Sequence, residues 1–226
     1  MSLIAEPPAH RHVRWRLTNL AREIKSLQLD EFDVQQLDFR YPYEKLPQKP
    51  TYFASYPGHS IPEPNTDNFR EPYKGLDDET EYSLTHISVG DSAFNNSGLY
   101  KHNQPEFGCY HITEMIDPAY PHIKALMYNN MVATDSTILC GELMPILRTM
   151  LTQLRRQKFI HQLVTPVLMF SLMGFQARVI EAFFRDDKLV LRPTKLFDFT
   201  HGNDNAFKTL ALWYMGNPLE ITTQGS

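Results

Sequence analysis

The sequence has few cysteines, no long apolar run and no large excess of charge of either sign. Its two cysteines, Cys109 and Cys140, are too few for a disulfide framework in 226 residues, and their mixed apolar surroundings predict buried free thiols. No apolar run is long and charge-free enough to span a bilayer, and the N-terminal MSLIAEPPAHRH lacks the apolar centre of a signal peptide. We therefore expect a soluble intracellular protein, cytoplasmic and without membrane contact.

The motifs of the common cofactor-dependent enzymes are also missing. The chain has no glycine-rich phosphate loop, no nucleophile elbow and no Cys-x-x-Cys pair, so no cofactor is expected. A formal net charge of -4 provides no general attraction for phosphate backbones, which argues against a nucleic-acid partner. A chain of this length is most simply one domain over residues 1–226, and it divides into three stretches of different character.

Residues 10–27 have the periodicity of an amphipathic helix with a strongly basic polar face. Apolar residues recur there at three- and four-residue steps, which is helical spacing. One interpretation is a surface helix with its apolar stripe on the core. Another is a helix that docks onto an acidic protein partner, or onto a second copy of the chain in a homo-oligomer. The apolar positions are Val13, Leu17, Leu20, Ile24 and Leu27, and the basic ones are Arg11, Arg14, Arg16, Arg22 and Lys25.

Residues 30–135 are rich in proline and tyrosine, above all between Pro42 and Pro72. Proline at this density excludes helix and interior strand, because each ring removes a backbone donor and fixes φ. A disordered linker would be poor in aromatic residues, so we expect this stretch to wrap over the folded part with its rings in surface grooves. Alternatively, rings such as Tyr52 and Tyr56 form one wall of a pocket for a small apolar ligand.

The C-terminal third, residues 138–216, has the clearest pattern, which is helix, strand, strand, strand, helix. A broad apolar face predicts a helix at 142–157, and an almost wholly apolar run predicts a strand buried on both faces at 166–173. We expect an α+β fold, in which a small mixed or antiparallel sheet has helices packed on it. Further strands are predicted at 177–184 and 189–192, a turn at 185–188, a final helix at 204–214, weaker edge strands at 79–89 and 107–112, and a short helix at 121–132.

Glu181 is the one charged residue inside the apolar run of the second of these strands. Strand alternation puts Glu181 on the same face as Val179 and Phe183, which presents a carboxylate on a mostly buried surface. A buried carboxylate needs a partner or a cation. Counting outward from the turn at 185–188 places Glu181 opposite Arg192, so a cross-strand ion pair is the simplest interpretation.

The element order of residues 138–216 resembles the core of the PD-(D/E)xK nuclease superfamily. This resemblance implies a Mg²⁺ site built from an acid on the first helix and acids on the following strands, where metal and a lysine activate water against a phosphodiester. Glu142 would take the helix position and Glu181 the strand position, as metal ligands. The chain departs from the family at the third position, because Asp186-Asp187-Lys188 has the character of a hairpin turn and Val190 stands where the family needs its acid.

The run from Pro166 to Phe199 is also similar to stretches in uncharacterised intracellular proteins of filamentous fungi, a similarity that implies no activity. Within this run and just beyond it, Asp198 and His201 place an acid near a histidine at the mouth of the sheet. With Glu181 these two residues would supply the polar catalytic groups of an enzyme. Their alternative role is to cap a loop and a helix.

Three hypotheses about function follow from these patterns. The first is a non-catalytic binding or protein-interaction module, with residues 10–27 or the aromatic segment as its contact surface. The second is a cofactor-independent enzyme that acts on a small, largely apolar molecule in an aromatic-lined pocket. The third is a metal-dependent phosphodiesterase, active or degenerate, and only this one requires Mg²⁺.

Overall fold

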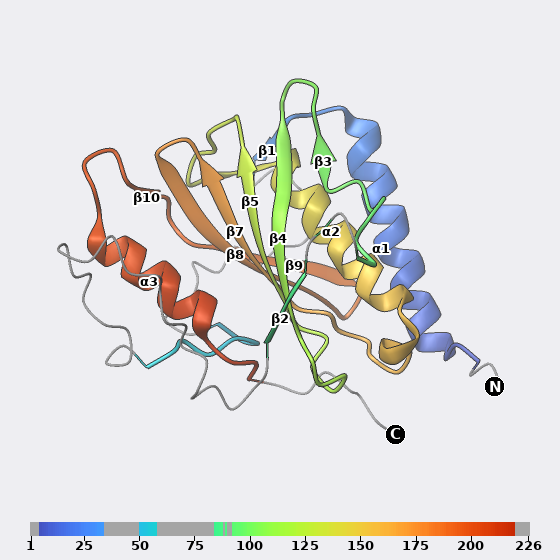
Figure 1. Ribbon diagram of the computed structural model, residues 1–226. Helices are drawn as coiled ribbons and strands as arrows, with labels where there is room; N and C mark the ends of the chain where they lie inside the picture. The colour runs from blue at the N-terminus through green and yellow to red at the C-terminus, as the bar shows by residue number, and fades with distance from the viewer. Residues whose placement is uncertain (1–4, 34–49, 58–83, 88, 90–91, 220–226) are drawn as a thin grey trace.

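A mixed β-sheet forms the centre of the molecule and has helices on both faces (Figure 1). Helices α1 (Pro8–Leu27) and α2 (Cys140–Arg155) lie on one face, and α3 (Asp204–Met215) lies on the other. The fold is therefore α+β, as the sequence predicts. The computed structural model describes residues 5–33, 50–57, 84–87, 89 and 92–219.

Within these described residues the central sheet has eight strands, of which six follow the order β2-β4-β5-β7-β8-β10. Strand β3 pairs with β4, and β9 pairs with β8. Strands β5 and β7 are parallel, whereas the other neighbours are antiparallel, and β1 and β6 form a separate antiparallel ribbon. The bounds are β1 Glu31–Asp33, β2 Leu84–Ile87, β3 Tyr100–Lys101, β4 Phe107–Met115, β5 Ile123–Asn129, β6 Thr137–Leu139, β7 Val167–Met173, β8 Gln176–Arg185, β9 Lys188–Pro193 and β10 Phe197–Asp198.

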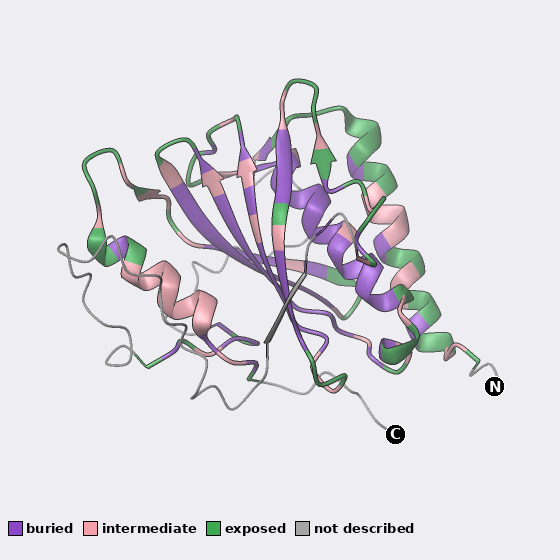
Figure 2. Ribbon diagram, viewed as in Figure 1, coloured by how far each residue is buried: buried purple, intermediate pink, exposed green. Residues whose placement is uncertain are grey.

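Helix α2 is the crossover between the parallel strands β5 and β7, which a two-residue hairpin could not join. It is buried along almost its whole length because the sheet covers one side and α1 covers another (Figure 2). Strand β1 follows α1 and pairs with β6, which leads directly into α2. The C-terminal end of α1 therefore lies beside the N-terminal end of α2, and the two helices run antiparallel.

The predicted elements of the C-terminal third are present with small shifts of their ends. The helix begins at Cys140, two residues before its predicted start, and Pro145 lies beyond its first turn. The hairpin between β8 and β9 is a two-residue turn in which Asp186 and Asp187 both have positive φ. Its register pairs Glu181 with Arg192, as the count along the sequence predicts.

The stretch 107–129 differs most from its prediction. The predicted helix at 121–132 is wrong, because residues 123–129 form β5, a central strand buried on both faces. The predicted edge strand at 107–112 is an interior one, β4, paired on both sides. A short apolar run is compatible with either a helix or a strand, so the pairing with neighbouring strands determines which of the two forms. Four of the eight strands of the central sheet, β2 to β5, thus come from the stretch 30–135, where only weak edge strands and a wrapping segment were predicted.

The helices and the two cysteines differ in how far each is buried. Helix α3 is half-buried along most of its length, in contrast to α2 (Figure 2). No helix among the described residues is both long and apolar enough to cross a membrane. Both cysteines are free thiols; Cys109 is buried and Cys140 is half-buried. Burial raises the pKa of Cys109 to about 12, so this thiol is inert at neutral pH.

Candidate functional site

Glu181 lies in the middle of β8 and is fully buried on the face that α3 covers. Its Oε2 is 2.7 Å from Nη1 of Arg192, which stands opposite it on β9. The same carboxylate accepts hydrogen bonds from the backbone N–H groups of Thr51, at 3.1 Å, and Tyr52, at 2.8 Å. Arg192 also donates to the hydroxyl of Thr51. The predicted cross-strand ion pair is confirmed, and it holds a distant segment of the chain.

Burial raises the pKa of Glu181, whereas the hydrogen-bond donors around its carboxylate lower that pKa in part. These donors are the N–H groups of Tyr52 and Thr51 and the guanidinium of Arg192. A carboxylate that already accepts three hydrogen bonds is oriented and charge-compensated. We therefore assign Glu181 to the anchoring of residues 50–57. Both oxygens of its carboxylate already accept hydrogen bonds, so neither is directed toward a substrate.

Residues 50–57, the strap, run between Glu181 and the C-terminal end of α3. The strap's N–H groups donate to carbonyl oxygens there, Ala54 to Asn217 and Tyr56 to Leu212, both at 2.8 Å. The ring of Tyr52 packs edge-on against Phe183 at 4.9 Å, and the side chains of Tyr52 and Tyr56 are buried. These two tyrosines thus pack the strap onto the fold.

Two buried basic residues lie beneath the strap and α3: His122, which directly precedes β5, and Lys124 within β5. The Nζ of Lys124 donates to the carbonyl oxygens of Tyr214 and Gly216, at the C-terminal end of α3, where a cation is favoured by the helix dipole. Burial lowers the pKa of Lys124 to about 7. Burial, with the nearby charge of Lys124, lowers the pKa of His122 to about 3. Sequence reasoning missed both residues, because their i, i+2 spacing has meaning only on a strand.

Glu142 lies in the first turn of α2, on the opposite face of the sheet from Glu181. Arg178 of β8 donates to both of its oxygens, through Nε at 2.9 Å and through Nη2, and both side chains are fully buried. Residues 178 and 181 are an odd number of steps apart on one strand, so their side chains leave the sheet on opposite sides. The structure therefore does not bring Glu142 and Glu181 together, and the predicted Mg²⁺ pair has no geometric basis. No cluster of three or more metal-ligating side chains occurs within the described residues.

Asp198 is the last residue of β10 and is exposed, and His201 lies in the exposed connection from β10 to α3. Oδ1 of Asp198 accepts from the N–H and the hydroxyl of Thr200, at 2.8 and 2.6 Å, and these bonds lower the pKa of Asp198. Asp198 pairs with Gln176, which is five residues from Glu181 and thus roughly 16 Å away along β8. The three predicted catalytic residues do not converge. Asn203 caps α3 through a bond from the N–H of Ala206 at 3.0 Å.

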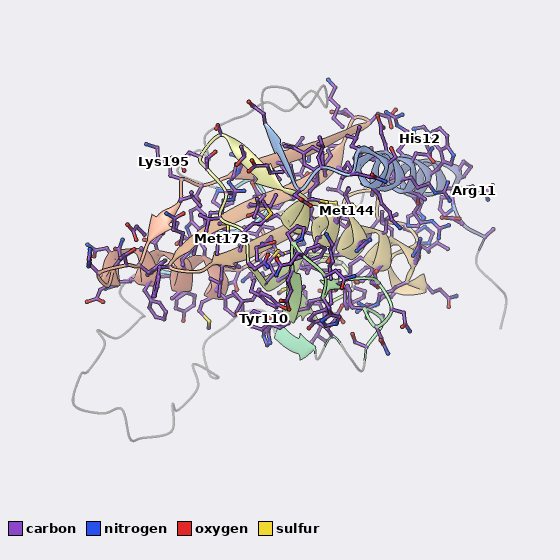
Figure 3. All side chains as sticks on the ribbon, turned by 90° about the horizontal axis from the view of Figure 1, so that it is seen from above. Arg11, His12, Tyr110, Met144, Met173 and Lys195 are labelled. Atoms are coloured by element: carbon purple, nitrogen blue, oxygen red, sulfur yellow. The ribbon has the colours of Figure 1, made fainter. Side chains whose placement is uncertain are left out.

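A cleft of about 260 Å³ opens between α1 and α2, and we name it the α1–α2 cleft. Four of its lining residues are cationic, and none of its described lining residues is acidic. Figure 3 shows Met144 toward the middle of the molecule, whereas Arg11 and His12 lie near the outer end of α1. The lining residues are Thr18, Ala21, Arg22, Lys25, Asn96, Ser97, Met144, Arg148, Leu151, Thr152 and Arg155.

The basic residues of α1 fall into two groups. In the first half of the helix, Arg14 lies 3.1 Å from the carboxylate of Glu6, and Arg16 lies 3.7 Å from that of Asp187 in the β8–β9 turn. In the second half, Arg22 and Lys25 are exposed, and no carboxylate of the described chain lies within ion-pair distance of either one. The basic pattern of residues 10–27 was visible in the sequence. The sequence did not show that the arginines of the first half are ion-paired whereas the cations of the second half line the cleft.

The described residues thus place the buried acids in structural ion pairs and leave uncompensated positive charge at the α1–α2 cleft. The cleft could not be located from the sequence, because no local pattern indicates that residues 18–25 and 144–155 face each other. Comparison of the chain with protein-family models, with curated proteins and with solved structures found no match in any of the three.

Proposed function

We propose that the protein is a non-catalytic binding module whose α1–α2 cleft binds an acidic segment of a partner protein. The observation that carries this proposal is the charge of the cleft lining, where Arg22, Lys25, Arg148 and Arg155 gather without a described acid among them. The whole chain has a net charge of -4, so this positive surface is a local concentration of charge. Local charge of this kind attracts and orients an oppositely charged partner.

Further support comes from the environment of the acids that an enzyme would use. Glu181 is saturated by Arg192 and by two backbone donors. Asp198 is occupied by Thr200 in an exposed turn. A catalytic base must reach the proton that it removes from a bound substrate. Neither carboxylate lines the α1–α2 cleft.

The strength of such binding depends on several weak charge contacts acting together. An exposed ion pair contributes only about 0.2–1 kcal/mol, and salt screens charges over about 10 Å at 0.1 M ionic strength. The cleft is walled by two helices, which lowers the exposure of a bound side chain to solvent. We therefore expect binding that requires several of the four cations and that weakens as the salt concentration rises.

The experiment that tests this proposal uses charge reversal on α1. A fluorescein-labelled peptide of alternating glutamate and glycine is titrated with the full chain and followed by fluorescence anisotropy. We expect saturable binding that Arg22→Glu/Lys25→Glu weakens at least about tenfold, equivalent to about 1.4 kcal/mol. The matched control, Lys188→Glu/Lys195→Glu, changes the net charge equally at exposed positions outside the cleft and should weaken binding less than about twofold.

Two results would contradict the proposal. One is equal weakening by both double variants, which would mean that the peptide responds to overall charge and not to the cleft. The other is the absence of saturable binding by the unaltered protein at low salt.

A further inference from the structure

The α1–α2 cleft is formed by two helix stripes that face each other. On α1 the lining residues follow steps of three, one and three, from Thr18 to Lys25, which is one face of a helix. On α2 they follow the same kind of spacing from Met144 to Arg155. Because the helices run antiparallel, cations from both of them surround one small space. The turn at residues 96–97 closes its side.

The size of the cleft restricts what it can hold. Pockets for drug-sized ligands typically measure about 300–1,000 Å³, and this cleft measures about 260 Å³. The cleft is open to solvent, so it fits one compact group with a short apolar stem while the rest of a larger ligand lies outside it. Ala21, Met144 and Leu151 supply apolar lining for such a stem, beside the four cations.

The charge of the cleft favours a group with more than one negative charge. A carboxylate has one charge and two acceptor oxygens, whereas a phosphate monoester has about 1.5 to 2 charges at neutral pH and three acceptor oxygens. Arginine presents a planar fork of donors that matches phosphate oxygens in a bidentate way. Three of the four cations are arginines, Arg22, Arg148 and Arg155.

One of these arginines is held in place before any ligand binds. Arg148 donates from Nη1 to the carbonyl oxygen of Gly98, and its side chain is half-buried. Gly98 has a φ of +69°, and a Cβ there would lie 3.0 Å from Nη1 of Arg148. The hydroxyls of Ser97 and Thr152, 2.9 Å apart, join the same turn to α2. The turn thus fixes one wall of the cleft and its guanidinium, which reduces the entropy lost on binding.

Building on the proposed function, we propose that the α1–α2 cleft recognises a phosphoserine or phosphothreonine side chain on a partner protein. A lipid surface would need a broad uncompensated basic face, but the arginines in the first half of α1 lie in ion pairs with Glu6 and Asp187. On α1 the cations without a described carboxylate partner are Arg22 and Lys25, and both line the cleft between the two helices. Recognition of phosphorylated motifs by arginine clusters is a recurring mode of peptide binding.

The test compares one 11-residue peptide with neutral flanks in three forms, carrying phosphothreonine, glutamate or threonine at its centre. Each is titrated with the full chain and followed by fluorescence anisotropy, in parallel with sedimentation of phosphatidylserine vesicles. We expect the phosphothreonine peptide to bind at least about tenfold more tightly than the glutamate peptide. Inorganic phosphate should compete with it.

The variant Arg22→Gln/Arg155→Gln should weaken phosphopeptide binding at least about tenfold. Both side chains are exposed, so the fold tolerates the change, and circular dichroism checks this. The matched control, Arg11→Gln/Arg14→Gln, removes the same charge outside the cleft and should leave affinity within about twofold.

Four outcomes would contradict the proposal of phosphate recognition, and each leads to a different conclusion. Equal affinity for the phosphothreonine and glutamate peptides overturns phosphate recognition but leaves the acidic-partner proposal standing. Absence of binding to both overturns phosphate recognition, and the acidic-partner proposal is overturned with it when the glutamate–glycine peptide also fails to bind. Vesicle binding without a preference for the phosphopeptide overturns this proposal in favour of a lipid surface. Equal weakening by the two glutamine variants also overturns it, because binding would then not depend on the cleft.

Discussion

At the scale of single residues, two buried carboxylates have the same role on opposite faces of the sheet. Glu142 of α2 binds Arg178 of β8, and Glu181 binds Arg192 beneath the strap. Glu181 also accepts from the backbone N–H of Tyr52 in the strap, whereas Glu142 accepts from the N–H of Leu139, the residue that precedes its own helix. Removing one member of such a pair leaves an uncompensated buried charge, and this costs about 3–5 kcal/mol. These acids therefore specify how segments dock, which explains their burial without a catalytic role.

His122 supports a prediction about the pH dependence of stability. The folded state holds its pKa at about 3, whereas an unfolded histidine titrates near 6.5. Between these values the unfolded chain binds more protons, so the free energy of unfolding falls as the pH falls from 6.5 toward 3. The slope from this residue approaches about 1.4 kcal/mol per pH unit. Urea denaturation of the wild-type protein and of His122→Leu, from pH 7 to pH 4.5, measures this contribution as a difference between the two.

The comparison with His122→Leu removes the contributions of the other titrating groups, among them Glu114 and Glu181, which both proteins share. The free energy of unfolding of the wild-type protein, relative to that of His122→Leu, should fall steadily below pH 6.5. A difference that stays constant over this range would show that His122 titrates normally in the folded protein.

At the scale of elements, the close approach of the strap to the end of α3 depends on Gly216. A Cβ at residue 216 would lie 1.7 Å from the carbonyl oxygen of Ala54, which is backbone and has little room to move. We expect Gly216→Ala to displace the strap and to lower the free energy of unfolding by about 1–3 kcal/mol. Hydrogen exchange followed by mass spectrometry should show faster exchange in peptides covering 50–57 and 212–219.

The control for this change is Asn205→Ala, at an exposed position near the start of the same helix. It should leave exchange in the strap unchanged. Unaltered exchange in Gly216→Ala would mean that the strap and α3 adjust without loss of their hydrogen bonds.

The same elements show how far the sequence predicts the fold. Strands β7, β8 and β9, the turn between them and helix α3 have strong local signals, and even the pairing of Glu181 with Arg192 follows from counting. Strand β5 has no such signal, because its apolar run is compatible with either helix or strand. Its structure is decided by β4 and β7, which flank it. The α1–α2 cleft likewise depends on two helices far apart in the sequence, so only its basic residues could be predicted.

At the scale of the whole molecule, the two faces of the sheet are covered to very different extents. Helix α2 is buried along most of its length, whereas α3 has a single buried residue, Ala206. The strap and α3 share a smaller apolar cluster, which includes Tyr52 and Phe53, and add hydrogen bonds with each other, with Lys124 and with Glu181. Free energies of local opening follow the buried apolar contacts of a region. We therefore expect α3 and the strap to open together while α1, α2 and the sheet stay folded.

Native-state hydrogen exchange at rising urea concentrations tests this order of opening. Amides of α3 and the strap should exchange at a lower free energy than amides of β5 and β7. The variant Leu147→Ala makes the test sharper, because Leu147 is fully buried on α2 and stays packed when α3 opens. This variant should lower the exchange free energy of β7 by about 2–5 kcal/mol and leave that of α3 unchanged. An equal fall in both regions would mean that the two faces of the sheet unfold as one unit.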